Sequence, residues 1–297
     1  MPSSGALRST PFVASLRHEL SLRNRIYAER LGLAMCESYG QPPAICYLAS
    51  ANGKTHGNFL SESYQAILKN DNWRRRLAKA HTQAKSALPR RDTPWKELDS
   101  SNSSDALLMN IFCFPGMLKE PRLPNLLGIE AGAVPEFGVK ARVPLANGRA
   151  DGTEVDMRLG DLLVEAKLTE SDFQRREVAV VEAYRDFHEV FDRRSLPREK
   201  NQYLSYQLIR NVLAAHANHC SFCVMADARR PDLLEAWYGV MRGVRIVELR
   251  PRCKMITWQE LAEVVPQKLQ RFLKDKYGIL PGTGRASYFP EASEASV

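Results

Sequence analysis

The sequence predicts an α/β fold of the α+β kind, in which a mixed sheet carries helices on both faces. Two observations support this prediction. The run 154–168 has the pattern of an antiparallel hairpin, and helical and strand patterns alternate after it. An antiparallel start followed by alternating helices and strands fits a mixed sheet covered on both sides. With 297 residues, the chain is long enough for one large domain or two modest ones.

The composition is that of a soluble globular protein, with 44% hydrophobic and 26% charged residues. No apolar run approaches the roughly 20 residues that span a bilayer, so no membrane association is expected. Six cysteines are scattered without a disulfide-like framework, which favours a reducing cytoplasm. Cys220 and Cys223 have Cys-x-x-Cys spacing, but no second pair exists. We expect them to pack in a buried strand rather than to bind zinc.

Residues 1–99 are expected to form a mainly helical N-terminal region. Its first helix is predicted over Leu16–Tyr39, ended by the run 40–43, with a short strand at Ile45–Ala49. A second helix, Lys69–Arg91, contains eight Lys or Arg and one acid, so its formal charge is 8 − 1 = +7. Apolar residues recur in it at helical spacing and leave a basic outer face.

The basic face of Lys69–Arg91 can bind nucleic-acid phosphates without reading the base sequence. The candidate residues are Arg74, Arg75, Arg76 and Lys79. A solvated helix without a partner explains the same pattern equally well.

The next elements lead into the hairpin. Residues 88–102 are expected to form a connector, after which Ser103 or Ser104 can cap a helix that ends before Pro115. Residues 137–145 alternate as a first strand, and Asn147–Gly148 provides a turn.

The hairpin itself has a definite predicted register. With Gly160–Asp161 as a two-residue turn, Leu159 pairs with Leu162, and Asp156 lies opposite Glu165. The register predicts a core face and a charged face. The core face has Val155, Met157, Leu159, Leu162, Val164, Ala166 and Leu168, and the charged face has Glu154, Asp156, Arg158, Glu165 and Lys167, with Leu163 as the exception.

Two carboxylates opposed across a strand pair lie about 5 Å apart at Cβ, which is unfavourable unless positive charge sits between them. Asp156 and Glu165 could therefore hold a divalent cation such as Mg²⁺, with Mn²⁺ as a substitute, that polarises a phosphodiester. The ammonium of Lys167 could orient or help deprotonate the attacking water and offset developing negative charge.

Beyond the hairpin, residues 171–199 are expected to form a surface helix and residues 201–217 a core helix. The core helix places Tyr203, Gln207, Arg210 and Asn211 on one side, where Arg210 could meet a phosphate. The remaining expected elements are a strand at 220–226, a helix at 232–241, a strand at 244–249, a helix from Thr257 to Lys276, and a disordered tail at 281–297.

At these residues the chain resembles the PD-(D/E)xK nuclease superfamily, the restriction-endonuclease-like fold, and within it a bacterial group labelled as restriction endonucleases. Asp156 matches the aspartate of the motif, and Glu165-Ala166-Lys167 matches its Glu-x-Lys element, while Val155 replaces the proline. The resemblance implies an α-β-β-β-α-β core over residues 100–280. It also implies magnesium-dependent phosphodiester cleavage, Gln207 near the metal or the DNA, and Asp105 as an additional metal ligand.

The leading hypothesis is therefore a cytoplasmic, metal-dependent DNA endonuclease with Asp156, Glu165, Lys167 and Gln207 at its site. The alternatives are a non-catalytic module on the same fold that binds DNA or another partner, and a nuclease that acts on RNA. A homodimer remains open, because nothing in the sequence marks an interface. Other acids also remain open for the site: Asp151, Glu130 and Glu136 as ligands, Glu154 as the salt-bridge partner of Lys167, and Asp161 as a turn residue.

Overall fold

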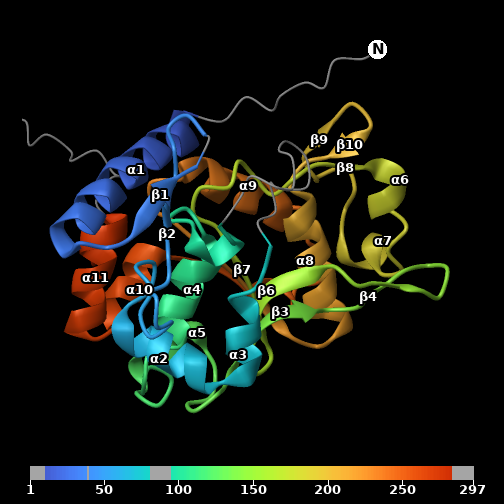
Figure 1. Cartoon of the computed structure of the whole chain (residues 1–297). Helices are drawn as coiled ribbons and strands as arrows, with labels where there is room; N and C mark the ends of the chain where they lie inside the picture. Colours follow the sequence, from blue (N-terminus) through green and yellow to red (C-terminus); the bar gives the residue numbers. More distant parts are fainter. Residues whose placement is uncertain (1–10, 39, 81–94, 283–297) are drawn as a thin grey trace, which may run out of the picture.

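The computed structural model describes residues 11–38, 40–80 and 95–282, and its centre is a five-stranded mixed sheet (Figure 1). The strand order is β12-β11-β7-β6-β3. The strands are β3 Pro135–Lys140, β6 Glu154–Leu159, β7 Leu162–Ala166, β11 Ser221–Ala226 and β12 Cys253–Thr257. The pairs β3–β6 and β6–β7 are antiparallel, whereas β7–β11 and β11–β12 are parallel. The predicted mixed α/β fold is confirmed.

The β6–β7 hairpin has the predicted register near its turn, where Leu159 pairs with Leu162 and Met157 with Val164. The predicted pair of Asp156 and Glu165 does not form, because the backbone pairs end at Met157–Val164 and the carboxylate of Asp156 accepts from the amide of Ala166. Gly160 opens the turn with φ +62°, a conformation that favours glycine because a Cβ would clash with the backbone. Counted from the first core helix, α4 Ser104–Phe112, and including α8 Tyr206–Ala217, the order α4-β3-β6-β7-α8-β11 reproduces the expected α-β-β-β-α-β succession.

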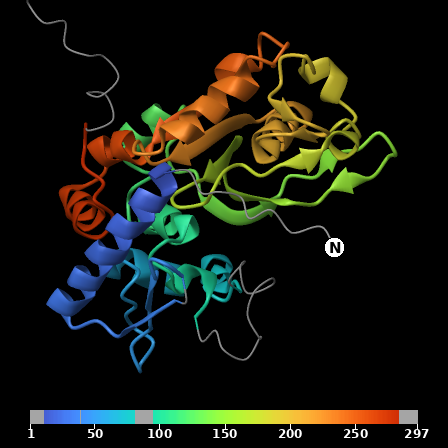
Figure 2. The ribbon, with the colours of Figure 1, turned by 90° about the horizontal axis from the view of Figure 1, so that it is seen from above.

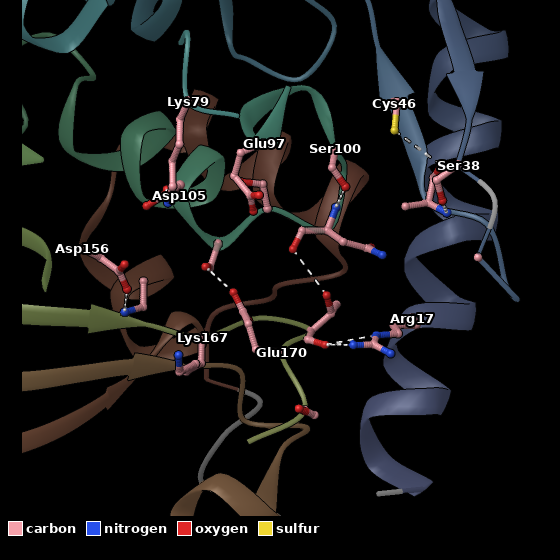
Figure 3. A pocket seen from close by; sticks show the side chains of 18 of the residues that line it. Arg17, Ser38, Cys46, Lys79, Glu97, Ser100, Asp105, Asp156, Lys167 and Glu170 are labelled. Atoms are coloured by element: carbon pink, nitrogen blue, oxygen red, sulfur yellow. Dashed lines mark hydrogen bonds and ion pairs between the residues drawn. The ribbon is translucent and has the colours of Figure 1, made fainter. Parts of the chain in front are cut away.

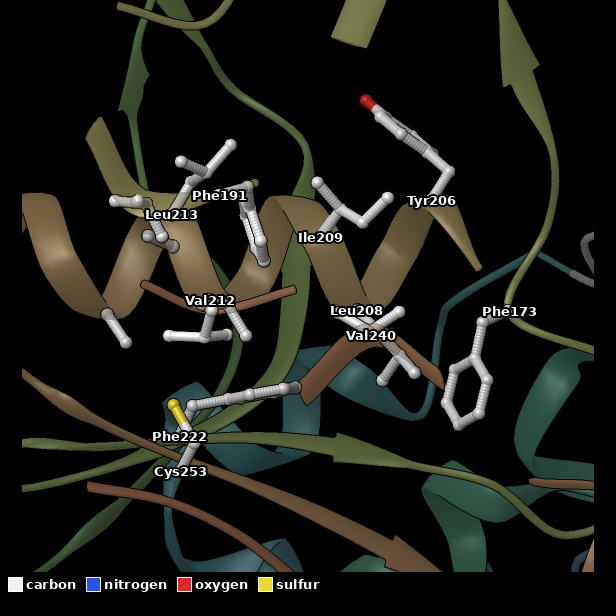
Figure 4. Close-up of a cluster of buried hydrophobic side chains, with 14 of the residues drawn as sticks. Phe173, Phe191, Tyr206, Leu208, Ile209, Val212, Leu213, Phe222, Val240 and Cys253 are labelled. Atoms are coloured by element: carbon white, nitrogen blue, oxygen red, sulfur yellow. The ribbon is translucent and has the colours of Figure 1, made fainter. Parts of the chain in front are cut away.

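Each face of the sheet is covered by its own hydrophobic cluster. One cluster joins Leu163 and Phe222 of the sheet to α8 and to α9 Pro231–Met241 (Figure 4). The other joins Leu162, Val164 and Ala166 to α4, α5 Arg122–Leu127, α10 Trp258–Val264 and α11 Gln267–Tyr277. Strand β7 is therefore buried on both sides. Leu163, the exception to the predicted charged face, belongs to the core under α8, and so does Val155, which the sequence predicts on the opposite face with Met157 and Leu159.

The N-terminal region packs directly on the sheet domain. Helix α1 Pro11–Leu31 lies beside α11 (Figure 2). It is followed by the hairpin of β1 Met35–Glu37 and β2 Ile45–Tyr47, then by α2 Ser61–Lys69 and α3 Asp71–Arg76. The amide of Ser101 donates to the carbonyl of Ile45 at 2.8 Å, which joins β2 to the segment before α4. The N-terminal region and the sheet domain are thus in contact, and the division at residue 99 applies only to the sequence.

Two N-terminal predictions need correction. The first helix ends at Leu31 rather than at Tyr39, because Gly32 adopts φ +59° and the chain turns into β1. The basic helix is shorter than expected. Helix α2 ends at Lys69, and the side chain of Asn70 caps a new helix, α3, by accepting from the amides of Asn72 and Trp73. Residues 81–94, which complete the predicted basic helix, lie outside the described residues.

The segment before α8 also differs from the prediction. Instead of one surface helix over 171–199, it contains the short helices α6 Val178–Val181 and α7 Phe187–Val190. A small sheet of β8 Arg176–Glu177, β10 Gln202–Tyr203 and β9 Arg198–Glu199 accompanies them. Helix α8 begins at Tyr206 rather than at Asn201, because Ser205 adopts φ +58°. Tyr203 therefore lies in β10 and not on the polar side of α8.

The last part of the chain shows two further differences. Val244 makes only an isolated bridge to Phe191, and the strand forms later as β12, after the 3₁₀ turn η3 Arg250–Arg252. Thr257 caps a helix as predicted, with Glu260 completing a capping box, but Pro266 separates α10 from α11.

The first strand of the core is also shorter than predicted. It ends at Lys140, and the chain continues into a separate two-stranded ribbon of β4 Val143–Pro144 and β5 Ala150–Asp151. All six cysteines are free, and Cys220 and Cys223 are buried as expected. Within the described residues, no helix is both long and apolar enough to cross a membrane.

Candidate active site

A cavity of about 730 Å³ opens where β6 begins and β7 ends, between the sheet and the N-terminal region (Figure 3). Asp156, Glu165 and Lys167 lie in its wall on the side of the sheet. The antiparallel hairpin accounts for this, because it brings the start of β6 beside the end of β7. The three predicted motif residues are thus brought together at one cavity.

Asp156 is held at the point where β6 and β7 separate. The backbone pairs end at Met157–Val164, and one carboxylate oxygen of Asp156 accepts a 2.8 Å hydrogen bond from the amide of Ala166. Burial raises the pKa of Asp156 well above its ordinary value, and the negative charges of Glu165 and Asp105 raise it further. Positive charge brought next to this carboxylate would therefore be strongly favourable.

Glu165 and Lys167 form a buried ion pair. Nζ of Lys167 lies 2.8 Å from Oε1 of Glu165, and Lys167 and Glu165 are only 5% and 2% exposed. Burial alone would lower the pKa of Lys167, but the charges of Glu165, Glu170 and Asp156 outweigh it and raise that pKa. Lys167 is therefore a cation at neutral pH.

Asn211 and Arg210 of α8 complete the surroundings of Glu165. Nδ2 of Asn211 donates to the second carboxylate oxygen, Oε2, at 2.9 Å, and the guanidinium of Arg210 lies 4.0 Å from the same oxygen. Asn211 lies on α8 and is fully buried, so it fixes the carboxylate from the helix side. Helical spacing alone places Asn211 on the polar side of this helix but indicates no role, because the contact joins residues 46 positions apart.

The loop after β7 is fastened through its backbone carbonyls. Trp258 Nε1 donates to the carbonyl of Lys167 at 2.9 Å, and Arg17 donates to that of Thr169 at 2.7 Å. Arg230 donates to the carbonyls of Leu168, Glu170 and Ser171. Five consecutive carbonyls, 167 to 171, are thus bound by side chains from α1, α10 and the start of α9. The sequence of the motif at 165–167 does not predict these partners.

Asp105 also lines the cavity, and two cations of the N-terminal region bind its carboxylate. Arg76 approaches it at 3.0 Å and Lys79 at 2.5 Å. Arg76 also pairs with Glu154, at 2.9 Å. The expected role of Asp105 as a metal ligand would require this carboxylate to leave its ion pairs, so the contacts favour Asp105 as an anchor for Arg76 and Lys79.

Gln207 and Glu170 occupy other parts of the cavity wall. Gln207 is the second residue of α8, and its buried oxygen Oε1 has no hydrogen-bond partner among the described residues. Glu170 accepts from Ser104 Oγ at 2.5 Å and from the amide of Leu168 at 2.7 Å. The sequence indicates no role for Glu170, although it follows the motif by only three residues.

The cationic candidates separate into exposed and internal groups. Arg74 and Arg75 are exposed on α3, in keeping with a phosphate-binding surface. Arg76 and Lys79 instead turn toward Asp105. Arg210 is only 2% exposed and donates to the carbonyl of Glu154 and to Asn211, so it is not placed to meet a phosphate.

The rival acids lie away from the cavity. Asp151 accepts a 2.5 Å hydrogen bond from Tyr184, and Glu154 pairs with Arg76 rather than with Lys167. Glu130 and Glu136 are exposed, and Asp161 occupies the hairpin turn. None of these five residues is among the described residues that line the cavity.

The donor set fits a hard cation by its chemistry. Asp156 and Glu165 supply carboxylate oxygens, and Gln207 has an amide oxygen that lacks a partner. Across residues 11–38, 40–80 and 95–282, however, no group of three or more His, Cys, Asp or Glu side chains is gathered as a metal site.

Comparison with known proteins adds one finding. A family model described as "Restriction Endonuclease associating with ARP" matches residues 34–278. The match covers both the sheet with its cavity and most of the N-terminal region. No curated protein and no solved structure matches the chain.

Proposed function

The chain belongs to the family of restriction endonucleases associating with ARP, and from this premise we propose that it is a metal-dependent endonuclease that hydrolyses phosphodiester bonds of DNA. The observation that carries the proposal is the convergence of Asp156, Glu165 and Lys167 on one cavity. Two carboxylates with a lysine beside them are the groups expected for phosphodiester hydrolysis by the PD-(D/E)xK superfamily, which the sequence resembles.

Asp156 and Glu165 are the proposed ligands of Mg²⁺, or of Mn²⁺ in its place, with the oxygen of Gln207 directly or through water. Such an ion, when bound, polarises a phosphodiester and offsets its charge. The raised pKa of Asp156, caused by burial and by its acidic neighbours, supports cation binding at this position.

Lys167 orients the attacking water and offsets negative charge that develops on the phosphate oxygens. Its pKa is raised by Glu165, Glu170 and Asp156 against the effect of burial, so it donates a hydrogen bond and does not accept the proton of the water. Asn211 holds Glu165 in place from α8, and the carbonyl contact to Trp258 fixes the backbone of Lys167.

Lys79 supplies a second cation at the cavity. It is 30% exposed, and its ammonium lies on Asp105 at 2.5 Å. Burial would lower the pKa of Lys79, but the charge of Asp105 outweighs it and raises that pKa. Lys79 is therefore positioned to contact a phosphate that enters from the side of the N-terminal region.

The proposal is tested with supercoiled plasmid incubated with wild type and Lys167→Ala, with Mg²⁺, with Mn²⁺ and with a chelator. We expect nicking or linearisation by wild type that depends on metal and disappears in Lys167→Ala. Lys274→Ala, which removes an exposed lysine of α11, is the matched control and should cut as wild type does. Equal cutting by wild type and Lys167→Ala would contradict the proposal. An RNA transcript of the same sequence tests the RNA nuclease alternative.

One observation favours a second candidate function, a non-catalytic DNA-binding module on the same fold. The ammonium of Lys167 already neutralises one oxygen of Glu165, at 2.8 Å, so the pair can exist without a metal. Calorimetric titration with Mg²⁺ distinguishes the two functions. The endonuclease requires binding that is weakened in Asp156→Asn, whereas the binding module shows no binding that depends on Asp156.

A further inference from the structure

The cavity has two ends of different chemistry (Figure 3). At one end lie the charged side chains of Asp156 and Lys167, and at the other lie Ser38 and Cys46 of the N-terminal region. The β1–β2 hairpin contributes the uncharged residues Ser38, Gln41, Pro42 and Ala44 to the wall at the second end. Arg17 lies on the same side of the cavity, where it donates to the carbonyl of Thr169 (Figure 3). One end therefore suits a phosphate, and the wall of the β1–β2 hairpin suits an uncharged polar group.

The far wall is a fixed part of the fold. Cys46 forms an isolated bridge with Ser100, and the amide of Ser101 donates to the carbonyl of Ile45 at 2.8 Å. Across the hairpin, Ser38 and Ala44 exchange backbone and side-chain hydrogen bonds of 2.9 and 2.8 Å. Hydrogen-bonded backbone thus joins the β1–β2 hairpin to the segment before α4, which also lines the cavity.

The reacting groups lie deep in this pocket. Glu165 is 2% exposed and Lys167 is 5% exposed. A phosphate must therefore enter the cavity to reach them. The volume of about 730 Å³ falls in the range of roughly 300–1,000 Å³ that is typical of pockets for small organic ligands. One unpaired nucleotide is of that size, whereas a base pair within a stacked duplex cannot be accommodated without being opened.

The uncharged polar lining also matches a nucleobase. Asn102 lines the cavity from the segment before α4, and within the described residues its buried amide oxygen has no hydrogen-bond partner. Such an oxygen accepts from the amino and imino groups on the edge of a base.

Resting on the proposed endonuclease function, we propose that the cavity holds an unpaired nucleotide and that the substrate is single-stranded DNA, or the unpaired strand of a branched or looped duplex. The phosphate lies at Lys167 and Lys79, and the base lies toward the β1–β2 hairpin. A fully paired duplex must first give up a base pair to the cavity, which costs a few kcal/mol.

The test compares three DNA substrates that contain the same strand: the strand alone, its blunt duplex, and a duplex in which the same segment is an unpaired loop. Cleavage is measured with Mg²⁺. Binding is measured separately by fluorescence anisotropy with a chelator present. We expect the single strand and the loop to be cut at least about tenfold faster than the duplex, since each factor of ten corresponds to about 1.4 kcal/mol of unpairing. Equal or faster cutting of the blunt duplex overturns the inference.

Filling the far end of the cavity provides the matched variants. Ala44→Leu and Ala44→Trp place bulk on the β1–β2 wall, away from Asp156 and Lys167. We expect single-strand binding to fall with the size of the new side chain. Leu48→Trp, which introduces the same side chain at an exposed residue just after β2, should bind as wild type does. Unchanged binding by both Ala44 variants overturns the location of the base.

The binding measurement separates this inference from the proposed function. A protein that cuts no substrate but prefers the single strand, with a preference weakened by Ala44→Trp, supports the nucleotide cavity and contradicts the endonuclease. A protein that cuts the duplex best supports the endonuclease and contradicts the nucleotide cavity. Tighter binding of an RNA strand of the same sequence would overturn the assignment to DNA.

Discussion

Arg230 donates a 2.8 Å hydrogen bond to the carbonyl of Glu170 from a guanidinium whose side chain has no exposed surface. The same guanidinium binds the carbonyls of Leu168 and Ser171 and forms an ion pair with Asp232. One side chain at the start of α9 therefore holds the loop that carries Lys167 and Glu170 into the cavity.

Replacing Arg230 with methionine should be strongly destabilising. The change leaves three carbonyls without a donor and removes the buried charge partner of Asp232, and breaking a buried ion pair typically costs about 3–5 kcal/mol. Unfolding in urea measures the difference. Arg193→Met is the matched control, because its ion pair with Glu182 is half exposed and should be worth less than about 1 kcal/mol. Similar destabilisation in both variants would refute the role of Arg230 as a clamp.

The carboxylates at the cavity should differ in their effect on metal binding. Asp156→Asn should weaken Mg²⁺ binding by at least about tenfold, because it removes a charged ligand. Asp105→Asn should leave that affinity within a few-fold, since Arg76 and Lys79 occupy its carboxylate. Isothermal titration calorimetry measures both. An equal weakening by the two substitutions would instead make Asp105 a metal ligand, as the family resemblance implies.

The exposed arginines of α3 should contribute to the salt dependence of DNA binding. We expect Arg74→Ala with Arg75→Ala to reduce the slope of log affinity against log salt by about one to two, roughly 0.9 for each phosphate that is no longer neutralised. The matched control removes Arg271 and Lys274, two exposed cations on α11. An unchanged slope in the α3 variant, measured by anisotropy between low and moderate salt, would exclude this surface from DNA binding.

Lys276 should make stability depend on pH. It is fully buried, and burial lowers its pKa well below the ordinary value, whereas the unfolded chain has a lysine pKa near 10.4. Between these two pKa values the unfolded state binds a proton that the folded state does not. The free energy of unfolding therefore rises with pH in this window, by up to about 1.4 kcal/mol per pH unit from this group.

Lys276→Met removes that contribution and is close in size to lysine. The free energy of unfolding of Lys276→Met should therefore exceed that of wild type by more at pH 7 than at pH 9, as measured by urea unfolding. The alternative is a cation held by the face of Tyr47, 3.6 Å from Nζ, and by Asn24 Oδ1, at 2.6 Å. If the difference in free energy of unfolding between Lys276→Met and wild type does not change with pH, the charged form of Lys276 is favoured.

The local parts of the fold could be predicted from the sequence. The β6–β7 register follows from alternating apolar residues and a glycine turn, and the caps at Ser103 and Thr257 follow from hydroxyl residues before helical patterns. Each of these signals acts within a few residues. The same locality explains why Asp156, Glu165 and Lys167 could be placed at one site from the motif alone.

The contacts that could not be predicted join distant residues. Arg76 and Lys79 have the pattern of solvent-facing cations, but their partner Asp105 lies 29 and 26 positions away. The charge pattern of 171–199 is equally compatible with a long surface helix. Phe187 and Tyr203 instead pack in the cluster that includes α8, and this packing favours short elements. Arg230 and Asn211 likewise acquire their roles through contacts that no local pattern encodes.

The pairing of α1 with α11 has a consequence for biosynthesis. Asn24 and Arg30 of α1 bind Lys276 and Asp275 of α11, so the first described helix finds its partner only after more than two hundred further residues have been added. At about 5–20 residues per second this takes roughly 12–50 seconds. The loop at Lys167 similarly cannot form its hydrogen bond to Trp258 until 91 further residues have been added. A nascent chain on the ribosome therefore lacks an assembled cavity until residues 258 and 276 have been added, and any hydrolytic activity begins only after that point.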